Sequence, residues 1–281
     1  MHEPDRHVIA VYSPKGGVGK TTLAVDMAWR SAALGRMDTL LWDLDAQGGA
    51  AFLLDQPHRR AGNVAGLFQK EGRPEQLITR TGYERLDLLG ADDSLRTLSW
   101  QLARLGRRQR LAEITWRLRR DYRRIVLDCP PLQNEVSYQV LLAADVVVVP
   151  LPPSPLSLRA LKLMVRDLRA AGARHPPILP VLAMFDGRRR EHRIARSDTM
   201  ADYPVIPLSA EIERTAFRRA PIGTFAPNSP AAEALDRLWR GVERKLRASG
   251  IGADDREGAS TLAQRIETVA AVPNRSKPVS V

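Results

Sequence analysis

Cysteine is almost absent from this chain of 281 residues, which contains only Cys129. A single cysteine excludes an intramolecular disulfide and a cysteine-rich metal site within one chain. Long apolar runs are absent too, since no stretch reaches the roughly 18–20 residues that a membrane-spanning helix needs. The first residues also lack the apolar core of a signal peptide. We therefore expect the protein in the cytoplasm.

Lysine is scarce as well. Six of the 43 basic residues are lysines and the others are arginines, and together they outnumber the 32 acidic residues. The net charge of +11 and the pI of about 10.4 predict a polyanionic partner, for which DNA is the simplest candidate. An arginine-rich codon bias of the source genome would give the same composition, so charge alone leaves both explanations open.

Strand-like apolar runs alternate along the chain with segments of helical periodicity. This alternation predicts a doubly wound α/β fold with a mostly parallel sheet and helices on both faces. The hydrophobic content of 44% is that of an ordinary globular protein of this length. The expected strands cover residues 7–13, 38–45, 86–89, 124–128, 145–150, 178–184 and 205–208, and the expected helices cover residues 23–34, 94–120, 156–171 and 231–246.

Three regions call for separate predictions. Residues 55–85 are polar and interrupted by proline and glycine, so we expect short helices and loops on the surface. The helix expected over residues 94–120 carries an arginine-rich face, typical of a solvated helix surface, and Gly106 would divide it. The arginines of that face are Arg104, Arg107, Arg108, Arg110, Arg117, Arg119 and Arg120. We expect a domain over residues 1–249 and a flexible tail over residues 250–281.

The strongest motif is a glycine-rich loop between the first strand and the first helix: Lys15, Gly16, Gly17, Val18, Gly19, Lys20, Thr21 and Thr22. Its glycines allow successive backbone N–H groups to point inward, and the following helix adds the positive end of its dipole. Such a concavity suits a polyphosphate, with Lys20 on the β- and γ-phosphates and the Thr21 hydroxyl on Mg²⁺. The loop is a variant P-loop, because Pro14 replaces a glycine and Lys15 adds a second lysine.

Carboxylates end two of the expected strands. Asp43 and Asp45 follow the second strand, before a flexible loop of small residues at 46–51, and Asp128 ends the strand 124–128. At the carboxyl end of a strand beside a phosphate loop, such groups can orient Mg²⁺ or a water molecule. Aspartate is also common in ordinary strand-terminal turns, but the neighbouring P-loop favours the functional interpretation. Cys129 is expected to be a packed thiol.

With these motifs in place, the chain resembles the ParA/MinD family of deviant Walker-A ATPases over roughly Val8 to Arg247. The resemblance rests on five segments in family order, at residues 15–22, 43–48, 126–131, 185–188 and 226–230. It implies an ATP-dependent homodimer in which Lys15 crosses the interface to the partner's nucleotide. An extra cation at that position would stabilise the charge that develops during phosphoryl transfer.

The same resemblance implies roles for individual residues. Lys15, Lys20 and Asp45 would be catalytic, with Asp45 orienting the attacking water. Thr21 would ligate Mg²⁺ directly and Asp128 through water, while Asp43 would support the loop. ATP would contact the whole loop from Lys15 to Thr22, and its adenine would lie near Phe185, Asp186 and the backbone of Pro207 and Leu208.

Partition ATPases of this family bind DNA without sequence preference, through basic residues at the rim of the dimer. Arg188 falls on such a family position, and the neighbouring candidates are Arg189, Arg190, Arg218 and Arg219. The chain departs from the family pattern at Ala46, Gly49 and Leu208, where proline, asparagine and arginine are usual. We expect the short type, without a helix-turn-helix, associated with the nucleoid and stimulated by a ParB-like protein or a cargo adaptor.

Three other functions of the superfamily are weaker alternatives. A MinD-like membrane-associated division-site regulator would need a C-terminal amphipathic helix, which the tail does not supply, so no membrane is expected. An iron–sulfur reductase would need two bridging cysteines in each subunit. A bacterial tyrosine kinase usually carries a tail of tyrosines, and none follows Tyr203. The motifs do not distinguish a plasmid, chromosome, chemoreceptor or microcompartment cargo.

Overall fold

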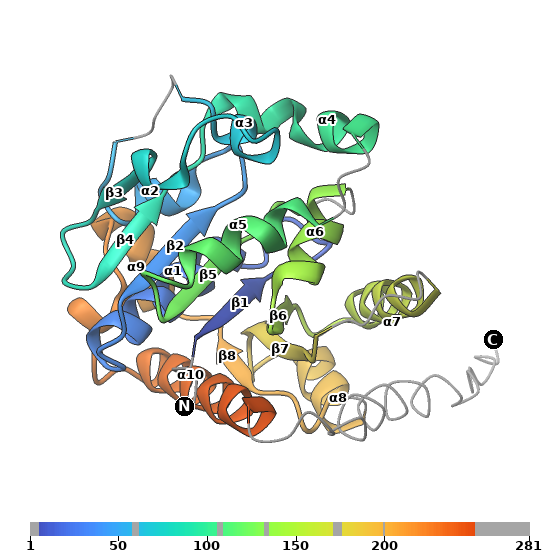
Figure 1. The fold of residues 1–281 in the computed structure, drawn as a ribbon. Helices are drawn as coiled ribbons and strands as arrows, with labels where there is room; N and C mark the ends of the chain where they lie inside the picture. The colour runs from blue at the N-terminus through green and yellow to red at the C-terminus, as the bar shows by residue number, and fades with distance from the viewer. Residues whose placement is uncertain are drawn as a thin grey trace.

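A sheet of eight strands runs through the centre of the computed structural model, which describes residues 6–57, 62–105, 109–131, 135–170, 176–198 and 200–250. The strand order is β3-β4-β2-β5-β1-β6-β7-β8 (Figure 1). The strands are β1 (His7–Val11), β2 (Thr39–Asp43), β3 (Ile78–Arg80), β4 (Leu86–Leu89), β5 (Arg124–Asp128), β6 (Val146–Leu151), β7 (Ile178–Phe185) and β8 (Val205–Pro207).

The sheet is parallel except at one edge, where β3 pairs antiparallel with β4. A parallel strand covered on both faces must be apolar throughout, and all six residues of β6 and all five of β5 are buried. The predicted α/β fold with a mostly parallel sheet is therefore confirmed. All seven expected strands are present, and three of them, β1, β2 and β8, are shorter than predicted.

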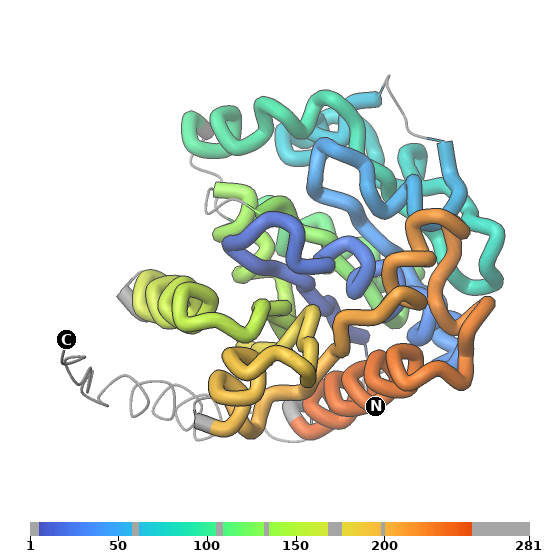
Figure 2. Tube along the Cα trace, turned by 180° about the vertical axis from the view of Figure 1, so that it is seen from behind, coloured from blue at the N-terminus to red at the C-terminus, as the bar shows by residue number. Residues whose placement is uncertain are grey.

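Helices cover both faces of the sheet. One core cluster joins the sheet to α1 (Lys20–Ala33), α2 (Gly49–Leu53) and α10 (Pro230–Gly250), on the face turned to the viewer in Figure 2. The other cluster joins it to α3 (Val64–Phe68), α4 (Leu98–Leu105), α5 (Arg110–Leu118), α6 (Glu135–Ala143) and α7 (Pro155–Ala170). The remaining helices are α8 (Arg190–Asp198), α9 (Ala210–Arg218) and the short 3-10 turns Pro74–Gln76, Asp93–Thr97 and Ile222–Thr224.

Two predictions of irregular surface structure were wrong. The loop expected over residues 46–51 becomes helix α2 from Gly49 onward, because Gly48 adopts a left-handed φ of 68° and Asp43 accepts a hydrogen bond from the Ala50 N–H. The region 55–85 was expected on the surface, yet all five residues of α3 are buried. Asn63 caps this helix by accepting the Gly66 N–H at 2.9 Å, which lets a short segment enter the core.

The helix expected over residues 94–120 is two helices, α4 and α5, and residues 106–108, with Arg107 and Arg108, lie outside the described part. Its arginine face is not uniformly solvated. Arg110 is buried and donates to the Leu67 carbonyl at 3.0 and 3.1 Å, and Arg119 pairs with Asp145 at 2.7 Å. These two arginines connect helices and strands within the fold. The tail expected beyond residue 250 is also outside the described residues.

Candidate active site

The predicted site residues meet at the carboxyl ends of four adjacent strands. In the sheet, β2, β5, β1 and β6 lie side by side, and Asp128 is in register with Val11 on one side and with Asp43 on the other. The P-loop follows β1 directly. Ligands of open α/β sheets bind at this edge, so the topology brings the loop and both carboxylate-bearing strands to one site.

The loop has the backbone that its glycines predict. Gly17 and Gly19 have φ angles of +70° and +84°, a region in which a side chain costs roughly 1–2 kcal/mol. The space where their Cβ atoms would lie is open, with no heavy atom within 4 Å. Helix α1 begins immediately afterward at Lys20, so its free N–H groups face the loop. This geometry fits a bound polyphosphate.

Lys20 is held at the mouth of the loop. Its side chain is buried, and its ammonium donates to the carbonyl of Lys15 at 3.3 Å. Burial lowers the pKa of Lys20, whereas the charges of Asp128 and Asp45 act in the opposite direction. The cation is thus desolvated but flanked by two carboxylates, which is the surrounding expected for a phosphate-binding lysine.

Asp43 braces the loop that carries Asp45. Its two oxygens accept the backbone N–H groups of Asp45 and Ala50, each at 3.0 Å. Burial and the nearby Asp128 raise the pKa of Asp43 well above its usual range. The hydrogen bonds agree with the supporting role that the sequence suggested for this residue.

Asp128 is the least satisfied polar group at the site. It is fully buried, and burial together with the charge of Asp45 raises its pKa to about 7, while the Thr21 hydroxyl and Lys20 oppose this shift. Neither of its carboxylate oxygens accepts a hydrogen bond of regular geometry. A buried carboxylate without donors beside a threonine hydroxyl is suited to a cation and its water shell.

The donor set fits Mg²⁺ held partly by phosphates. In the part of the chain that the structure describes, no group of three or more His, Cys, Asp or Glu side chains could enclose a metal. Mg²⁺ usually binds through one or two carboxylates, waters and substrate phosphates. Gly49 limits the space around Thr21, because a Cβ at this glycine would lie 3.1 Å from the Thr21 Cγ2 atom.

Asp45 begins the turn into α2 and is half-buried. Its Oδ1 atom accepts the Gln47 N–H at 3.1 Å, and its carbonyl accepts the Gly48 N–H at 2.9 Å. Both contacts are with its own loop, so the carboxylate stays close to Lys20 at the solvent-facing side of the site. It is well located to orient a water molecule.

Lys15 reaches across to the next strand connection. Its ammonium lies 3.1 Å from the Ser157 hydroxyl, which in turn lies 2.8 Å from the Ser154 hydroxyl. Ser157 lies in the first turn of α7, and Ser154 directly precedes this helix, after β6. No carboxylate pairs with Lys15 among the contacts described. Lys15 therefore does not belong to the charged group formed by Lys20, Asp45 and Asp128.

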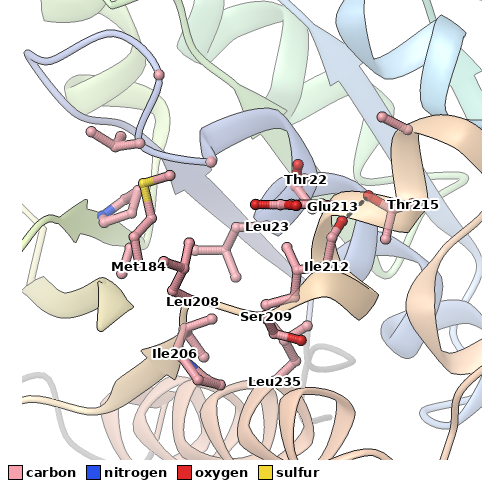
Figure 3. Close-up of a pocket in the computed structure, with 17 residues that line it drawn as sticks. Thr22, Leu23, Met184, Ile206, Leu208, Ser209, Ile212, Glu213, Thr215 and Leu235 are labelled. Carbon is pink, nitrogen blue, oxygen red and sulfur yellow. Dashed lines mark hydrogen bonds between the residues drawn. The ribbon is translucent and has the colours of Figure 1, made fainter. Parts of the chain in front are cut away.

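A pocket of about 210 Å³ adjoins the loop on the side of β7, β8 and α9 (Figure 3). Gly17, Val18, Gly19, Thr22 and Leu23 form its loop end, and Pro150, Ala183, Met184, Ile206, Pro207, Leu208, Ser209, Ile212, Glu213, Thr215, Ala216 and Leu235 complete the lining. Most of these groups are apolar, as in a site for a planar base. Pro207 and Leu208, which the sequence predicted to lie near the adenine, line this pocket.

Phe185 and Asp186 are not among the residues that line this pocket. Neighbouring side chains of a strand point to opposite sides, and Met184 faces the pocket instead, with a φ of +57° at an irregular step in the β7–β8 register. The Phe185 ring contacts His192 and Arg196 of α8. Sequence reasoning missed Met184 and the whole of α9, whose amphipathic pattern at 210–218 was the available signal.

The five candidate DNA-binding arginines form two separate groups. Arg188, Arg189 and Arg190 lie at the start of α8, whereas Arg218 and Arg219 lie at the end of α9, and the two helices are well apart in both views (Figures 1 and 2). All five are exposed.

Two of these arginines form ion pairs within the chain, and Arg218 stacks on Phe225. Arg188 binds Asp186 at 2.9 and 3.0 Å, which lowers the pKa of Asp186 to about 2. Arg219 pairs with Asp55 at 3.1 Å and stacks on Phe52. Their guanidinium groups are therefore less free for a polyanion than those of Arg189 and Arg190.

Residues 6–178 match the protein family described as an AAA domain. The chromosome partitioning protein ParA of Caulobacter vibrioides is 28% identical over 250 residues, covering 84% of this chain and 93% of that protein. The chromosome-partitioning ATPase Soj of Thermus thermophilus is 30% identical over 252 residues, covering 85% of this chain and 96% of that protein.

Solved structures share the fold. McdA of Cyanothece, in a complex with ATP, superposes with a TM-score of 0.74 at 19% identity, covering 87% of this chain and 98% of that one. A Mycobacterium smegmatis protein named cobyrinic acid a,c-diamide synthase, with a bound ATP analogue and magnesium, superposes with a TM-score of 0.71 at 25% identity, covering 87% and 96%. Among the described residues, no helix is both long and apolar enough to cross a membrane.

Proposed function

The chain belongs to the ParA/MinD family of P-loop ATPases, and from this premise we propose that it is an ATP-dependent partition or positioning ATPase. It forms a homodimer with ATP, binds nucleoid DNA without sequence preference, and moves a DNA or protein cargo in the cytoplasm. The observation that supports this proposal most directly is Lys15, a second lysine in the loop, which contacts Ser157 and has no carboxylate partner among the described residues.

The nucleotide and its metal are assigned to residues of this chain by their chemistry. The loop from Lys15 to Thr22 would surround the phosphates, and the apolar pocket bounded by Pro207 and Leu208 would take the adenine. Thr21 and Asp128 would hold Mg²⁺, the latter through water, because Asp128 is a buried carboxylate without hydrogen-bond donors. When bound, Mg²⁺ neutralises charge on the phosphate oxygens.

Hydrolysis would then need a positioned water and a further cation. Asp45 is held by its own turn next to Lys20, from which it can accept a proton from water and orient the oxygen. Lys15 would leave Ser157 and reach the nucleotide of the second copy, where its charge stabilises the transferring phosphoryl group. Two copies thus complete each other's sites.

The DNA surface is assigned to the arginines at the start of α8. Arg189 and Arg190 are exposed and unlike Arg188 have no described ion pair. Adjacent guanidinium groups displace counterions from a phosphate backbone, which gives binding without sequence preference. A ParB-like protein or a cargo adaptor would stimulate hydrolysis and release the dimer from DNA.

The proposal is tested on the full chain with Mg²⁺ and either ADP or ATP. Light scattering after size-exclusion chromatography should give a monomer with ADP and a dimer with ATP, and a mobility-shift assay should detect duplex DNA binding only with ATP. ATP hydrolysis should be slow and should rise with DNA. A chain that dimerises equally with both nucleotides, or that binds no DNA with ATP, would contradict the proposal.

A further inference from the structure

One charged side chain lines the pocket between the loop and β8. It is Glu213, in the first turn of α9, and every other lining residue is apolar, glycine or hydroxyl-bearing. A carboxylate is an acceptor only and repels the phosphates of a nucleotide. Glu213 is exposed, so water solvates its charge in the free chain, and only beside a bound phosphate does that charge need a compensating interaction.

Two of the neighbouring hydroxyl groups already have partners. Thr215 donates to the Ile212 carbonyl at 2.7 Å, and Ser209 is hydrogen-bonded to Glu211. The described contacts give no hydrogen bond or ion pair to the carboxylate of Glu213. Its acceptor capacity is therefore available to a ligand in the pocket.

Glu213 reaches into the pocket from α9, beside Thr22 of the loop end. Gly17 and Gly19 mark the phosphate end, and Pro207 and Leu208 mark the base end. Figure 3 shows Glu213 beside Thr22, with Met184 on the far side of the cavity. In a nucleotide the sugar joins the base to the phosphates, so it must lie between these two ends.

A ribose is the part of the nucleotide that offers donors at this point. Its 2′- and 3′-hydroxyls are adjacent, and one carboxylate can accept a hydrogen bond from each. Dinucleotide-binding folds use an acidic residue in the same chemical role. Such a pair of bonds would offset the repulsion between Glu213 and the phosphates.

We propose that Glu213 accepts hydrogen bonds from the ribose hydroxyls and makes the site selective for ribonucleotides over deoxyribonucleotides. This rests on the proposed function, because it requires that the pocket holds an adenine nucleotide. A site built to bind a hydroxyl discriminates against the analogue that lacks it. Since the bonds go to a charged acceptor, we expect about ten- to a hundredfold weaker binding of the deoxy analogue.

Isothermal titration calorimetry of the full chain with Mg²⁺ tests this, using ADP, 2′-deoxyADP, 3′-deoxyADP and GDP. Diphosphates avoid hydrolysis and ATP-dependent dimerisation during the titration. The wild type should prefer ADP over both deoxy forms, and Glu213→Gln and Glu213→Ala should lose that preference. Glu211→Gln is the matched control, because Glu211 is on the same helix but is bound to Ser209 and does not line the pocket.

The outcomes separate the two proposals. Equal binding of ADP and the deoxy forms by the wild type, or an unchanged preference in both Glu213 variants, would overturn the ribose role while leaving the nucleotide site intact. A loss of discrimination against GDP alone would show that Glu213 reads the base, which also overturns it. If the wild type binds none of these nucleotides, the proposed function itself fails. Thermal unfolding of each variant confirms that it is folded.

Discussion

The Nζ atom of Lys15 lies 3.1 Å from the Oγ atom of Ser157. Ser157 is fully buried in the first turn of α7, where the helix dipole is positive and does not favour a cation. The ammonium therefore gains one neutral hydrogen bond there and no charge partner. In the free chain Lys15 is held by a contact that a phosphate could readily replace.

Lys15→Ala should abolish ATP-dependent dimerisation while ADP binding survives, because Lys20 and the loop backbone remain. Ser157→Ala should have the opposite effect and promote dimerisation at an ATP concentration about two- to tenfold lower, by removing a hydrogen bond. Light scattering over an ATP titration measures both. The double variant is the control: if Ser157→Ala still changed the behaviour of Lys15→Ala, the effect would not act through Lys15.

Asp45→Ala should reduce ATP hydrolysis by about a hundredfold or more and trap the dimer on DNA. The reason is that the variant keeps Lys20, Thr21 and Asp128, which bind the nucleotide and the metal, but loses the group that orients water. Phosphate release and the lifetime of the DNA complex are measured on the same preparation. Normal turnover in this variant would contradict the assignment of Asp45.

The raised pKa of Asp128 predicts a pH dependence of stability in the nucleotide-free, metal-free protein. The pKa rises from 3.8 in the unfolded chain to about 7 in the fold, mainly through burial, so the folded state binds the proton more tightly. The contribution of this group is fully present below pH 3.8 and is lost as the pH rises toward 7.

Asp128→Asn has no proton to lose and should be more stable than the wild type at neutral pH. Its advantage should shrink on acidification. Urea unfolding of both proteins at several pH values measures the difference. A difference that stays constant across this range would show that Asp128 does not titrate in the fold.

Arg189→Ala should reduce the slope of log K for DNA against log salt by about 0.9, the value for one phosphate contact. Arg237→Ala on α10 removes the same charge from an exposed position and is the matched control, for which the slope should not change. Arg218→Ala tests the separate group on α9. Equal slopes for Arg189→Ala and the wild type would remove Arg189 from the contact surface.

Glu243→Ala should destabilise the fold by about 3–5 kcal/mol, because it leaves a buried guanidinium unpaired. Glu243 holds Arg124 through bonds of 3.1 and 2.7 Å, and the Arg124 side chain is fully buried. Replacing both residues, as Arg124→Met with Glu243→Leu, should restore most of the loss. Urea denaturation measures both free energies of unfolding, and a double variant no more stable than Glu243→Ala would contradict this account.

Seven of the strands and the phosphate loop were predictable because local sequence alone decides them, whereas β3 lies in a region expected to form short helices and loops. Residues 125–127 are apolar and lie between Arg124 and a terminal Asp128, and the strand has the predicted bounds 124–128 in the fold. Gly17 and Gly19 predict positive φ angles, which few other residue types adopt. Where the structure depends only on residues close together in the chain, the sequence was sufficient to predict it.

The rest depended on contacts between distant segments. The sequence pattern placed Arg110 on a solvated helix face. Its side chain is instead buried and donates a hydrogen bond to the carbonyl of Leu67, 43 residues away. At the pocket, Met184 replaces Phe185 because an irregular register on β7 decides which side chain faces inward. Neither arrangement leaves a periodic signal in the sequence, since each depends on the packing of another element.

Asp43 and Asp128 are two acids in register on neighbouring strands, and they set the stability of the folded protein against its activity. Burial raises the pKa of both carboxyl groups, so holding them ionised at neutral pH costs the fold stability, and under the proposed function bound Mg²⁺ would offset that cost at Asp128. Selection of variants for thermal stability alone should therefore favour loss of Asp128. The selected variants would be stable but catalytically inactive. In living cells, Asp128 would be maintained only by selection for ATP hydrolysis.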